Sequence, residues 1–426
     1  MKIQDYAGQV AVTTRNANDN NVELEFMDKN TFELEITDIA YGGDGIGRKD
    51  GFVYFVRGAA PGEKILARET QKKKSFGRAT IMEILRISQK RIAPPCPLAY
   101  TAGKQIFCPG CSYQHLECEE EIKIKNSQFI SFIKKAFPEL DDKKIAAPLK
   151  CPKDLNYRNK ITLHSQNGKL GYFSEDNKTV LDIQECAIAA PQINSLIMEY
   201  REKNPVNTKD ENITFRLTEP EGAFYFSTGD VTEDKIIQEN TSIGVFQLPA
   251  KSFFQVNPFS MELLLNEISE IFGKLGTQCM LDIYCGCGIF TVLAAKKGIR
   301  HSIGIDIDSR SIKYAVLNSQ KHRVAYKCSF RSGHAEDIFK KNPPDIPPEK
   351  TLVLLDPPRG GIGNEMAELL LKKNCRWLLY VSCAPDILSR DLAKLRTGYE
   401  IEHAVMLDMF PRTSQFESIV LCKAKK

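Results

Sequence analysis

The chain contains no run of about 18 consecutive apolar residues, so its sequence predicts no membrane-spanning helix. The opening segment MKIQDYAGQVAVTTRNANDNN has no basic start followed by an apolar stretch, which argues against a secretory signal. Thirteen cysteines in a 426-residue chain without such a signal indicate reduced thiols that serve as metal ligands or in catalysis, not a disulfide framework. We therefore expect a cytoplasmic protein with no membrane partner.

The chain also lacks a large charge excess, because 58 Lys and Arg face 54 Asp and Glu, a net charge of +4. Residues 32–91 alone hold 12 basic and 8 acidic residues, and this difference of +4 equals the net charge of the whole chain. A positive charge gathered in one small segment indicates either a solvated face or a surface for an anionic partner, of which nucleic acid is the commonest.

Short alternating segments begin at residue 32, after an Asn-rich lead-in (1–31) that we expect to be flexible. FELEITDIA, GFVYFV, EKILARE and GRATIMEIL predict a small β-barrel over 32–91, with YGGDGIGRKDG as a glycine-rich turn. Such barrels bind single-stranded nucleic acid on basic, aromatic faces. TQKKKSFGRA places Lys72, Lys73 and Lys74 beside an aromatic residue; the alternative is that these lysines form only a solvated turn.

A central α+β domain is predicted over 92–250, with a helix at about 119–137 and a hairpin turn at Asn167-Gly168. From about 256 onward, apolar strands alternate with helices, and only PRTSQFE separates the last two strands. The fold class predicted for 251–426 is α/β: a doubly wound, mostly parallel sheet with helices on both faces and a final antiparallel pair. Ligands of such folds bind at the carboxyl ends of the strands.

LDIYCGCGIFT (281–291) is a strand that breaks into a Gly-x-Gly turn and enters a helix. The third glycine of a dinucleotide fingerprint is missing, and the next strand ends in Asp306, an acidic residue that can hold two ribose hydroxyls. The shorter loop suits a ligand without a pyrophosphate, such as S-adenosylmethionine. The alternative is a plain strand-to-helix turn.

Two further strands end in reactive residues. Within TLVLLDPPRGG the strand ends at Asp356, before two prolines. Within YVSCAPDIL the strand ends at Cys383, before a proline turn. Neighbouring parallel strands should bring both residues to one rim, where a helix N-terminus can lower the pKa of the thiol and activate it as a nucleophile. The alternative is that Cys383 is a buried small residue.

Together, LDIYCGCGIFT, LLDPPRGGI, YVSCAPDILSRDL, DMFPRTSQFE and SFFQVN resemble the RNA (uracil-5-)-methyltransferases, in the family's order and over roughly 32–422. Residues 32–91 look like the TRAM barrel of several members. The resemblance implies an S-adenosylmethionine-dependent (Rossmann-like) methyltransferase domain in which Cys383 adds to uracil C6 and Glu417 accepts the C5 proton. It places Asp356 on the pyrimidine edge and Gln255 in the same pocket.

The methyl donor would contact Tyr284, Asp306 and His334, with Phe253 packing nearby. Two histidines usual in the family's last block are replaced by Arg412 and Gln415, which puts the surroundings of Glu417 in question.

Cys108 and Cys111 form a Cys-x-x-Cys pair, with Cys96 upstream and Cys186 downstream. Their spacing suits zinc or an iron–sulfur cluster equally. The resemblance implies a [4Fe-4S] cluster on these four residues, although the gap after Cys96 is longer than usual and Cys118 is a substitute for it. No Cys-x3-Cys-x2-Cys triplet is present, which argues against radical chemistry.

The resemblance implies RNA as the partner, and the barrel and cluster favour 23S ribosomal RNA over transfer RNA. Rival hypotheses are a cytosine C5 methyltransferase, which would need a second thiol where Pro358 stands, and a non-catalytic cluster-containing RNA-binding protein. We expect a monomer.

Overall fold

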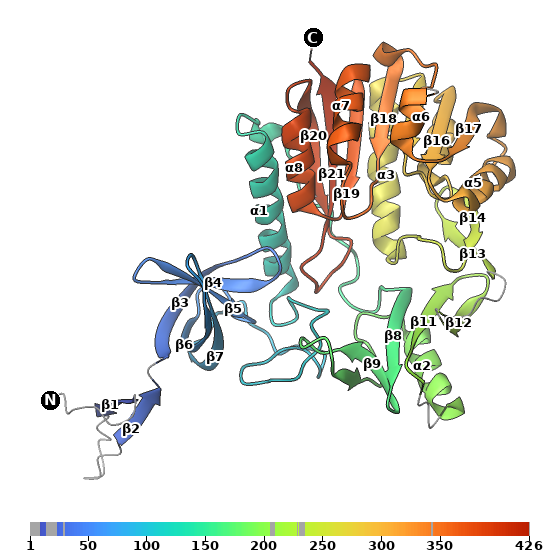
Figure 1. Cartoon of the computed structure of the whole chain (residues 1–426). Helices are drawn as coiled ribbons and strands as arrows, with labels where there is room; N and C mark the ends of the chain where they lie inside the picture. The colour runs from blue at the N-terminus through green and yellow to red at the C-terminus, as the bar shows by residue number, and fades with distance from the viewer. Residues whose placement is uncertain are drawn as a thin grey trace. The chain divides into compact units, whose positions relative to one another are not determined.

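The computed structural model describes residues 9–13, 24–28, 30–204, 209–227, 229, 235–341 and 344–425. The chain divides into two compact units, Met1–Glu120 and Glu121–Lys426, which are described separately (Figure 1). Within the predicted lead-in, β1 (Gln9–Thr13) pairs antiparallel with β2 (Leu24–Asp28). The rest of that lead-in, apart from Asn30 and Thr31, lies outside the described residues.

The first unit contains a closed five-stranded barrel of order β3-β4-β5-β7-β6, which confirms the predicted fold of this segment. Alternate residues of the strands point inward and fill a core that includes Leu34, Ile36, Val56 and Ile65. The strands are β3 (Thr31–Ile39), β4 (Asp44–Lys49), β5 (Phe52–Arg57), β6 (Lys64–Lys72) and β7 (Gly77–Arg86).

The interpretation of YGGDGIGRKDG as a simple turn was wrong, because its middle forms strand β4. Gly45 and Gly47 are buried, and a Cβ atom at Gly47 would lie 2.5 Å from Leu34 Cγ. The two glycines therefore allow β4 to cross the small barrel closely, where any side chain would collide with the core. A glycine-rich stretch has the composition of a turn, so this strand was hidden from the sequence pattern.

The segment after the barrel, which carries three of the predicted cluster cysteines, is attached to the barrel by a buried ion pair. Arg91 Nε lies 2.5 Å from Glu63 Oε1, and an Arg91 guanidinium nitrogen donates to the Gly58 carbonyl at 2.6 Å. Tyr100 packs so closely on Gly58 that a Cβ there would lie 2.3 Å from its ring. These contacts order the cysteine loop against the barrel.

The second unit begins with helix α1, followed by a five-stranded sheet of order β10-β9-β8-β11-β12. The turn between β8 and β9 has positive φ at Asn167 (53°) and Gly168 (75°), as a two-residue hairpin requires, so this predicted turn is confirmed. The elements are α1 (Cys118–Ala136), β8 (Lys160–Gln166), β9 (Lys169–Phe173), β10 (Val180–Asp182), α2 (Pro191–Lys203), β11 (Glu211–Thr218), β12 (Gly222–Ser227) and the hairpin β13 (Ile236–Thr241) with β14 (Gly244–Pro249).

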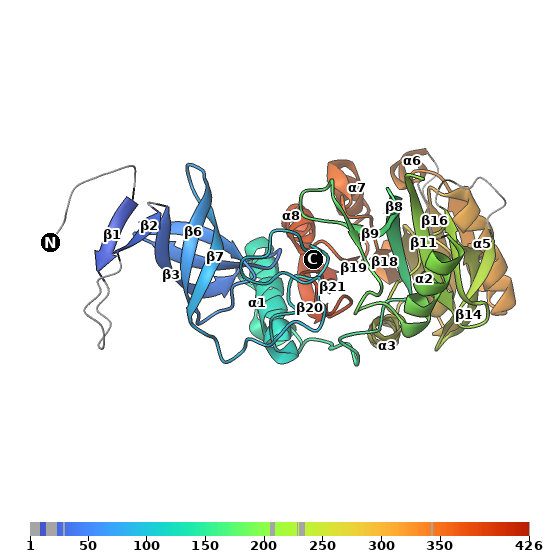
Figure 2. The same ribbon diagram turned by 90° about the horizontal axis from the view of Figure 1, so that it is seen from below.

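A seven-stranded sheet of order β17-β16-β15-β18-β19-β21-β20 forms the rest of the unit, and β21 runs in the direction opposite to the other six strands. Helices cover both faces, with α7 and α8 in front of the sheet and α3 behind it in Figure 1, and Figure 2 gives the view from below. The predicted doubly wound fold is confirmed. Its strands are β15 (Cys279–Ile283), β16 (His301–Asp306), β17 (Cys328–Ser332), β18 (Thr351–Leu355), β19 (Trp377–Ser382), β20 (Tyr399–Leu407) and β21 (Glu417–Ala424). Its helices are α3 (Pro258–Leu275), α4 (Ile289–Lys296), α5 (Ser309–Lys321), α6 (Ala335–Lys341), α7 (Gly363–Lys373) and α8 (Pro385–Leu395).

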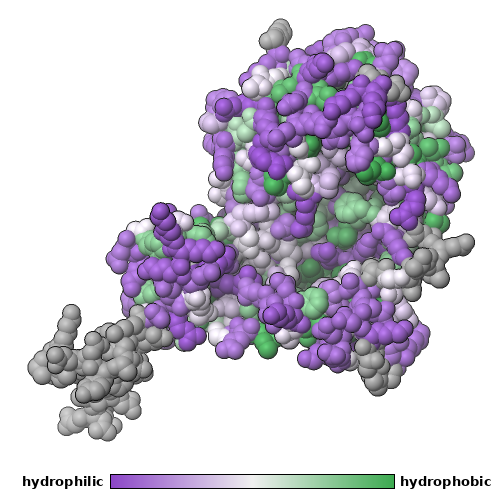
Figure 3. Space-filling view, in the orientation of Figure 1, coloured by the Kyte–Doolittle hydropathy of each residue, from purple (hydrophilic) through white to green (hydrophobic). Residues whose placement is uncertain are grey.

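Among the described residues, no helix is both long and apolar enough to cross a membrane. The face seen in Figure 3 is mainly hydrophilic, with apolar residues scattered between polar ones. Such scattered apolar residues are usual on a protein surface.

Candidate active site

The strand order of the large sheet reverses between β15 and β18, which identifies the carboxyl ends of these strands as the expected binding site. β15 pairs in parallel with both β16 and β18, and β18 pairs in parallel with β19. Asp306 is the last residue of β16, and Tyr284, Asp356 and Cys383 directly follow β15, β18 and β19, so the topology brings these predicted residues to one edge.

The loop after β15 has an unusual backbone. Tyr284 has φ of 70°, and Gly286 (52°) and Gly288 (85°) also have positive values. The Gly286 N–H donates to Asp306 Oδ2 at 2.9 Å, which ties the loop to the end of the next strand. A Cβ at Gly286 would meet no atom within 4 Å, so the backbone faces open space into which a ligand can fit.

Asp306 also accepts a hydrogen bond from the Asp308 N–H, at 2.8 Å from Oδ1. Ile307, between them, exposes 60% of its surface, and the sequence analysis missed it. An apolar side chain left exposed beside an acidic strand end can cover a flat ring while the carboxylate binds hydroxyl groups. The signal was in the sequence, since an apolar residue directly follows the acidic one.

His334 follows β17 at the same edge, because Asp306 pairs with Ser332 and the Gly333 N–H donates to the Asp306 carbonyl at 2.9 Å. Its side chain is exposed. The structure thus places Tyr284, Asp306 and His334 around one end of the sheet.

Asp282, in β15, is a second residue that the sequence analysis did not single out. It is fully buried, and Thr291 Oγ1 donates to its Oδ2 at 2.6 Å. Burial raises the pKa of Asp282 to about 7, an effect that the Thr291 hydrogen bond opposes and the nearby Asp356 increases. Only the folded structure reveals this, because the burial of a strand carboxylate depends on its neighbours.

We expect the raised pKa of Asp282 to make stability depend on pH. The folded protein holds this proton up to about pH 7, whereas an aspartate in the unfolded chain releases it near pH 3.8, so stability falls as pH rises between these values. Asp282→Asn should therefore gain stability relative to the unmodified protein from pH 4 to pH 8, by up to about 4 kcal/mol. Urea unfolding at several pH values measures this. A stability difference that does not change with pH would contradict it, and Asp345→Asn, at an exposed position, is the control.

The three residues assigned to the target base lie together. Ser382 pairs with Ser418 across β19 and β21, so the next residues of the two strands, Cys383 and Glu417, are neighbours. Asp356, at the end of β18, influences the pKa of both. Glu417 is 2% exposed and Cys383 is half-buried.

The expectation that a helix N-terminus lowers the pKa of Cys383 was wrong for the unliganded protein. Burial and the nearby carboxylate of Glu417 raise that pKa to about 11, although Cys383 directly precedes α8. Burial also raises the pKa of Asp356 to about 7 and that of Glu417 well above its usual range. Arg359 opposes these effects, because its charge and its hydrogen bond lower the pKa of Cys383.

Gln255 and Phe253 differ in their surroundings. Gln255 is buried (9% exposed), and it lies two residues before Asn257, whose side chain donates to the Met409 carbonyl at 2.9 Å. Phe253 is 74% exposed, so no buried position supports the prediction that its ring packs beside the methyl donor.

Of the two residues that replace family histidines, only Arg412 is well buried, at 1% exposed. Its backbone N–H donates to Glu121 Oε1 at 2.7 Å, and Nη1 lies 3.2 Å from Glu121 Oε2. Gln415 is half-buried, and its backbone N–H donates to Thr413 Oγ1 at 3.2 Å.

The predicted cluster ligands do not form a metal site by themselves. In the ranges that the structure describes, no three His, Cys, Asp or Glu side chains are arranged to hold a metal ion. Cys96, Cys108 and Cys111 belong to the first unit and Cys186 to the second. Their thiol chemistry suits both iron and zinc.

The remaining cysteines include structural ones. Cys285 and Cys287 are buried, as expected for loop packing, and Cys151 Sγ lies 3.4 Å from Asn257 Nδ2.

Comparison with known proteins identifies the class. Residues 26–82 match the TRAM domain, and residues 349–425 match the tRNA (Uracil-5-)-methyltransferase family. The fold resembles that of the Pyrococcus abyssi tRNA (uracil-54, C5)-methyltransferase in complex with S-adenosyl-L-homocysteine. The TM-score is 0.71 at 21% identity, over 92% of this chain and 100% of that one. The fold is thus that of an S-adenosylmethionine-dependent methyltransferase with an N-terminal TRAM-like barrel.

Two bacterial relatives define the family. An uncharacterized RNA methyltransferase of Bdellovibrio bacteriovorus is 32% identical over 400 residues, which cover 91% of this chain and 93% of the relative. Another, from Aquifex aeolicus, is 29% identical over 441 residues and is covered completely. The chain belongs to this RNA methyltransferase family and is an RNA methyltransferase.

Proposed function

We propose that this enzyme methylates C5 of a uridine in RNA, using S-adenosylmethionine. The observation that carries the proposal is the grouping of Cys383, Glu417 and Asp356 at the carboxyl edge of the sheet. A thiol nucleophile beside a buried carboxyl group is what addition to a pyrimidine ring and later proton removal require.

The proposed reaction begins when the Cys383 thiolate adds to C6 of the uracil, which makes C5 nucleophilic. C5 then attacks the methyl group, and S-adenosylhomocysteine leaves with the former sulfur–carbon bonding pair. Glu417 removes the C5 proton, and the electrons of the C5–H bond re-form the ring double bond as the C6–sulfur bond breaks. Asp356 is assigned to hold the pyrimidine edge, with Gln255 in the same pocket.

Arg359 has a role in the first step. Its guanidinium is the cation that lowers the pKa of Cys383 against the effects of burial and of Glu417. It therefore stabilises the thiolate that must form before attack.

The methyl donor fits the loops after β15, β16 and β17. The open backbone at Gly286 leaves space for it, Asp306 is placed to bind ribose hydroxyls, and the exposed Ile307 can cover the adenine. Tyr284 and His334 lie at the same edge of the sheet, and we assign them to the same methyl-donor site.

The barrel is proposed to bind the RNA chain. Lys49 Nζ lies 4.4 Å from the centroid of Phe32, and Lys72 and Lys73 lie 5.4 and 5.2 Å from those of Phe52 and Phe76. Phe32 is buried, whereas Phe52 and Phe76 are half-buried, so the lysines beside these two rings can supply both phosphate attraction and stacking surfaces.

We assign 23S ribosomal RNA as the substrate, with transfer RNA as the second candidate. The test is to map 5-methyluridine by mass spectrometry in both RNA classes, from cells with and without this gene. A 5-methyluridine lost only from transfer RNA would overturn the ribosomal assignment. A lost 5-methylcytidine would favour the rival reaction, which the proline at position 358 disfavours.

A [4Fe-4S] cluster on Cys96, Cys108, Cys111 and Cys186 remains a prediction. We expect anaerobically purified protein to contain stoichiometric iron and sulfide, and Cys108→Ser to lose both because a thiolate ligand is removed. Cys151→Ser should keep them. Bound zinc without sulfide would contradict the cluster. Cys118→Ser distinguishes that residue from Cys96 as a ligand.

A further inference from the structure

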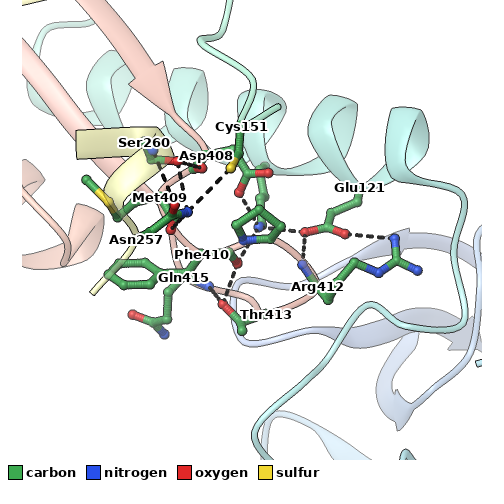
Figure 4. Close-up of polar contacts among 12 residues, drawn as sticks. Glu121, Cys151, Asn257, Ser260, Asp408, Met409, Phe410, Arg412, Thr413 and Gln415 are labelled. Atoms are coloured by element: carbon green, nitrogen blue, oxygen red, sulfur yellow. Dashed lines mark hydrogen bonds and ion pairs between the residues drawn. The ribbon is translucent and has the colours of Figure 1, made fainter. Parts of the chain in front are cut away.

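The loop that joins β20 to β21 ends at Glu417, the first residue of β21. Side chains from other elements bind this loop (Figure 4). Each of its first four carbonyl groups accepts a hydrogen bond from such a side chain. The pairs are Ser260 Oγ to Asp408 (3.0 Å), Asn257 Nδ2 to Met409 (2.9 Å), Lys125 Nζ to Phe410 (3.1 Å) and Tyr157 Oη to Pro411 (2.9 Å). These bonds fix the first part of the loop, residues 408–411, which leads toward Glu417 at the start of β21.

Four charged residues form a buried cluster on this loop, two from α1 and two from the loop itself. Lys125 Nζ lies 2.7 Å from Glu121 Oε1 and 2.8 Å from Asp408 Oδ1. Glu121 in turn accepts from both the backbone and the side chain of Arg412. All four residues are at most 4% exposed.

The three donors of the Lys125 ammonium group are matched by acceptors on Glu121, Asp408 and Phe410, so no donor lacks a protein partner. Burial alone would lower its pKa, but Asp408 and Glu121 together raise it. The cluster pairs two positive with two negative side chains. A buried ion cluster is a poor source of stability compared with apolar packing, but it fixes directions that apolar contacts leave free.

The structure assigns Lys125 and Glu121 as positioning residues for Glu417. We infer that they hold the β20–β21 loop so that the Glu417 carboxyl group faces C5 of the bound uracil during proton removal. This inference rests on the proposed function. It also gives a role to Arg412, whose side chain and backbone N–H bind the carboxylate of Glu121.

Lys125→Met tests the inference, because it removes the ammonium group but keeps much of the volume. Misplacing Glu417 by about 1 Å should lower kcat on the order of 10²-fold with little change in KM. Slow proton removal should also increase the isotope effect with RNA deuterated at uridine C5, and should increase the fraction of enzyme bound covalently to ordinary RNA. Lys135→Met, at an exposed position on the same helix, should match the unmodified enzyme.

Removing one partner of a buried ion cluster can prevent folding, so circular dichroism must first show that Lys125→Met is folded. Tyr157→Phe is the milder variant: it removes the hydrogen bond from the hydroxyl to the Pro411 carbonyl but keeps the ring, and it should change both readouts in the same direction by less. A folded Lys125→Met enzyme with the unmodified isotope effect and adduct fraction would overturn the inference, as would an unchanged Tyr157→Phe if Lys125→Met does not fold. If the unmodified enzyme forms no adduct with 5-fluorouridine RNA, the proposed function itself fails.

Discussion

Cys383→Ala should abolish covalent capture of RNA that carries 5-fluorouridine at the target position. The unmodified enzyme should form an adduct that survives denaturation, because fluorine at C5 cannot be removed as a proton and the C6–sulfur bond then persists. Without the thiol, no bond to C6 forms, and methyl transfer should fall to background because C5 alone is a poor nucleophile. Denaturing gel electrophoresis of labelled RNA measures the adduct.

Cys328→Ala is the matched control for this experiment. Cys328 is also half-buried, but it begins β17 and so lies at the opposite end of the strands from the proposed site. It should retain both adduct and activity. An unchanged adduct in Cys383→Ala would remove the nucleophile assignment.

Glu417→Gln should also lower turnover strongly. Unlike Cys383→Ala, which abolishes the adduct, it should make the adduct accumulate. The amide keeps the size of the side chain but cannot accept the C5 proton, so the methylated intermediate cannot release Cys383. We expect turnover to fall by a factor of at least about 10²–10⁴, the usual contribution of a positioned base. Adduct with ordinary uridine RNA should accumulate in the presence of methyl donor.

The control is Glu400→Gln, an exposed position on the neighbouring strand β20. Normal turnover by Glu417→Gln would exclude the residue as the base. Failure to form any adduct would contradict this order of steps, since the charge of Glu417 raises the pKa of Cys383 and its removal should favour the attacking thiolate.

Much of the catalytic domain could be predicted from the sequence because strand and helix periodicities are local properties. The helix predicted at about 119–137 is α1 (Cys118–Ala136), and in the catalytic domain the predicted neighbours β18 and β19 are paired in parallel. β4 could not be predicted, since its glycines satisfy a tertiary demand for close packing. The roles of the site residues remain proposals, but their shared edge followed from the topology.

The sequence by itself determined which chemical groups are available and at which strand ends they stand: a thiol at 383, carboxyl groups at 306, 356 and 417, and glycines between β15 and α4. Only the tertiary structure decided how these groups behave. Burial raises the pKa values of Cys383, Asp356 and Glu417, and two charged residues of α1, nearly 300 positions earlier, bind the loop that precedes Glu417. Desolvation and long-range ion pairing depend on what surrounds a residue in space, and no local pattern records that.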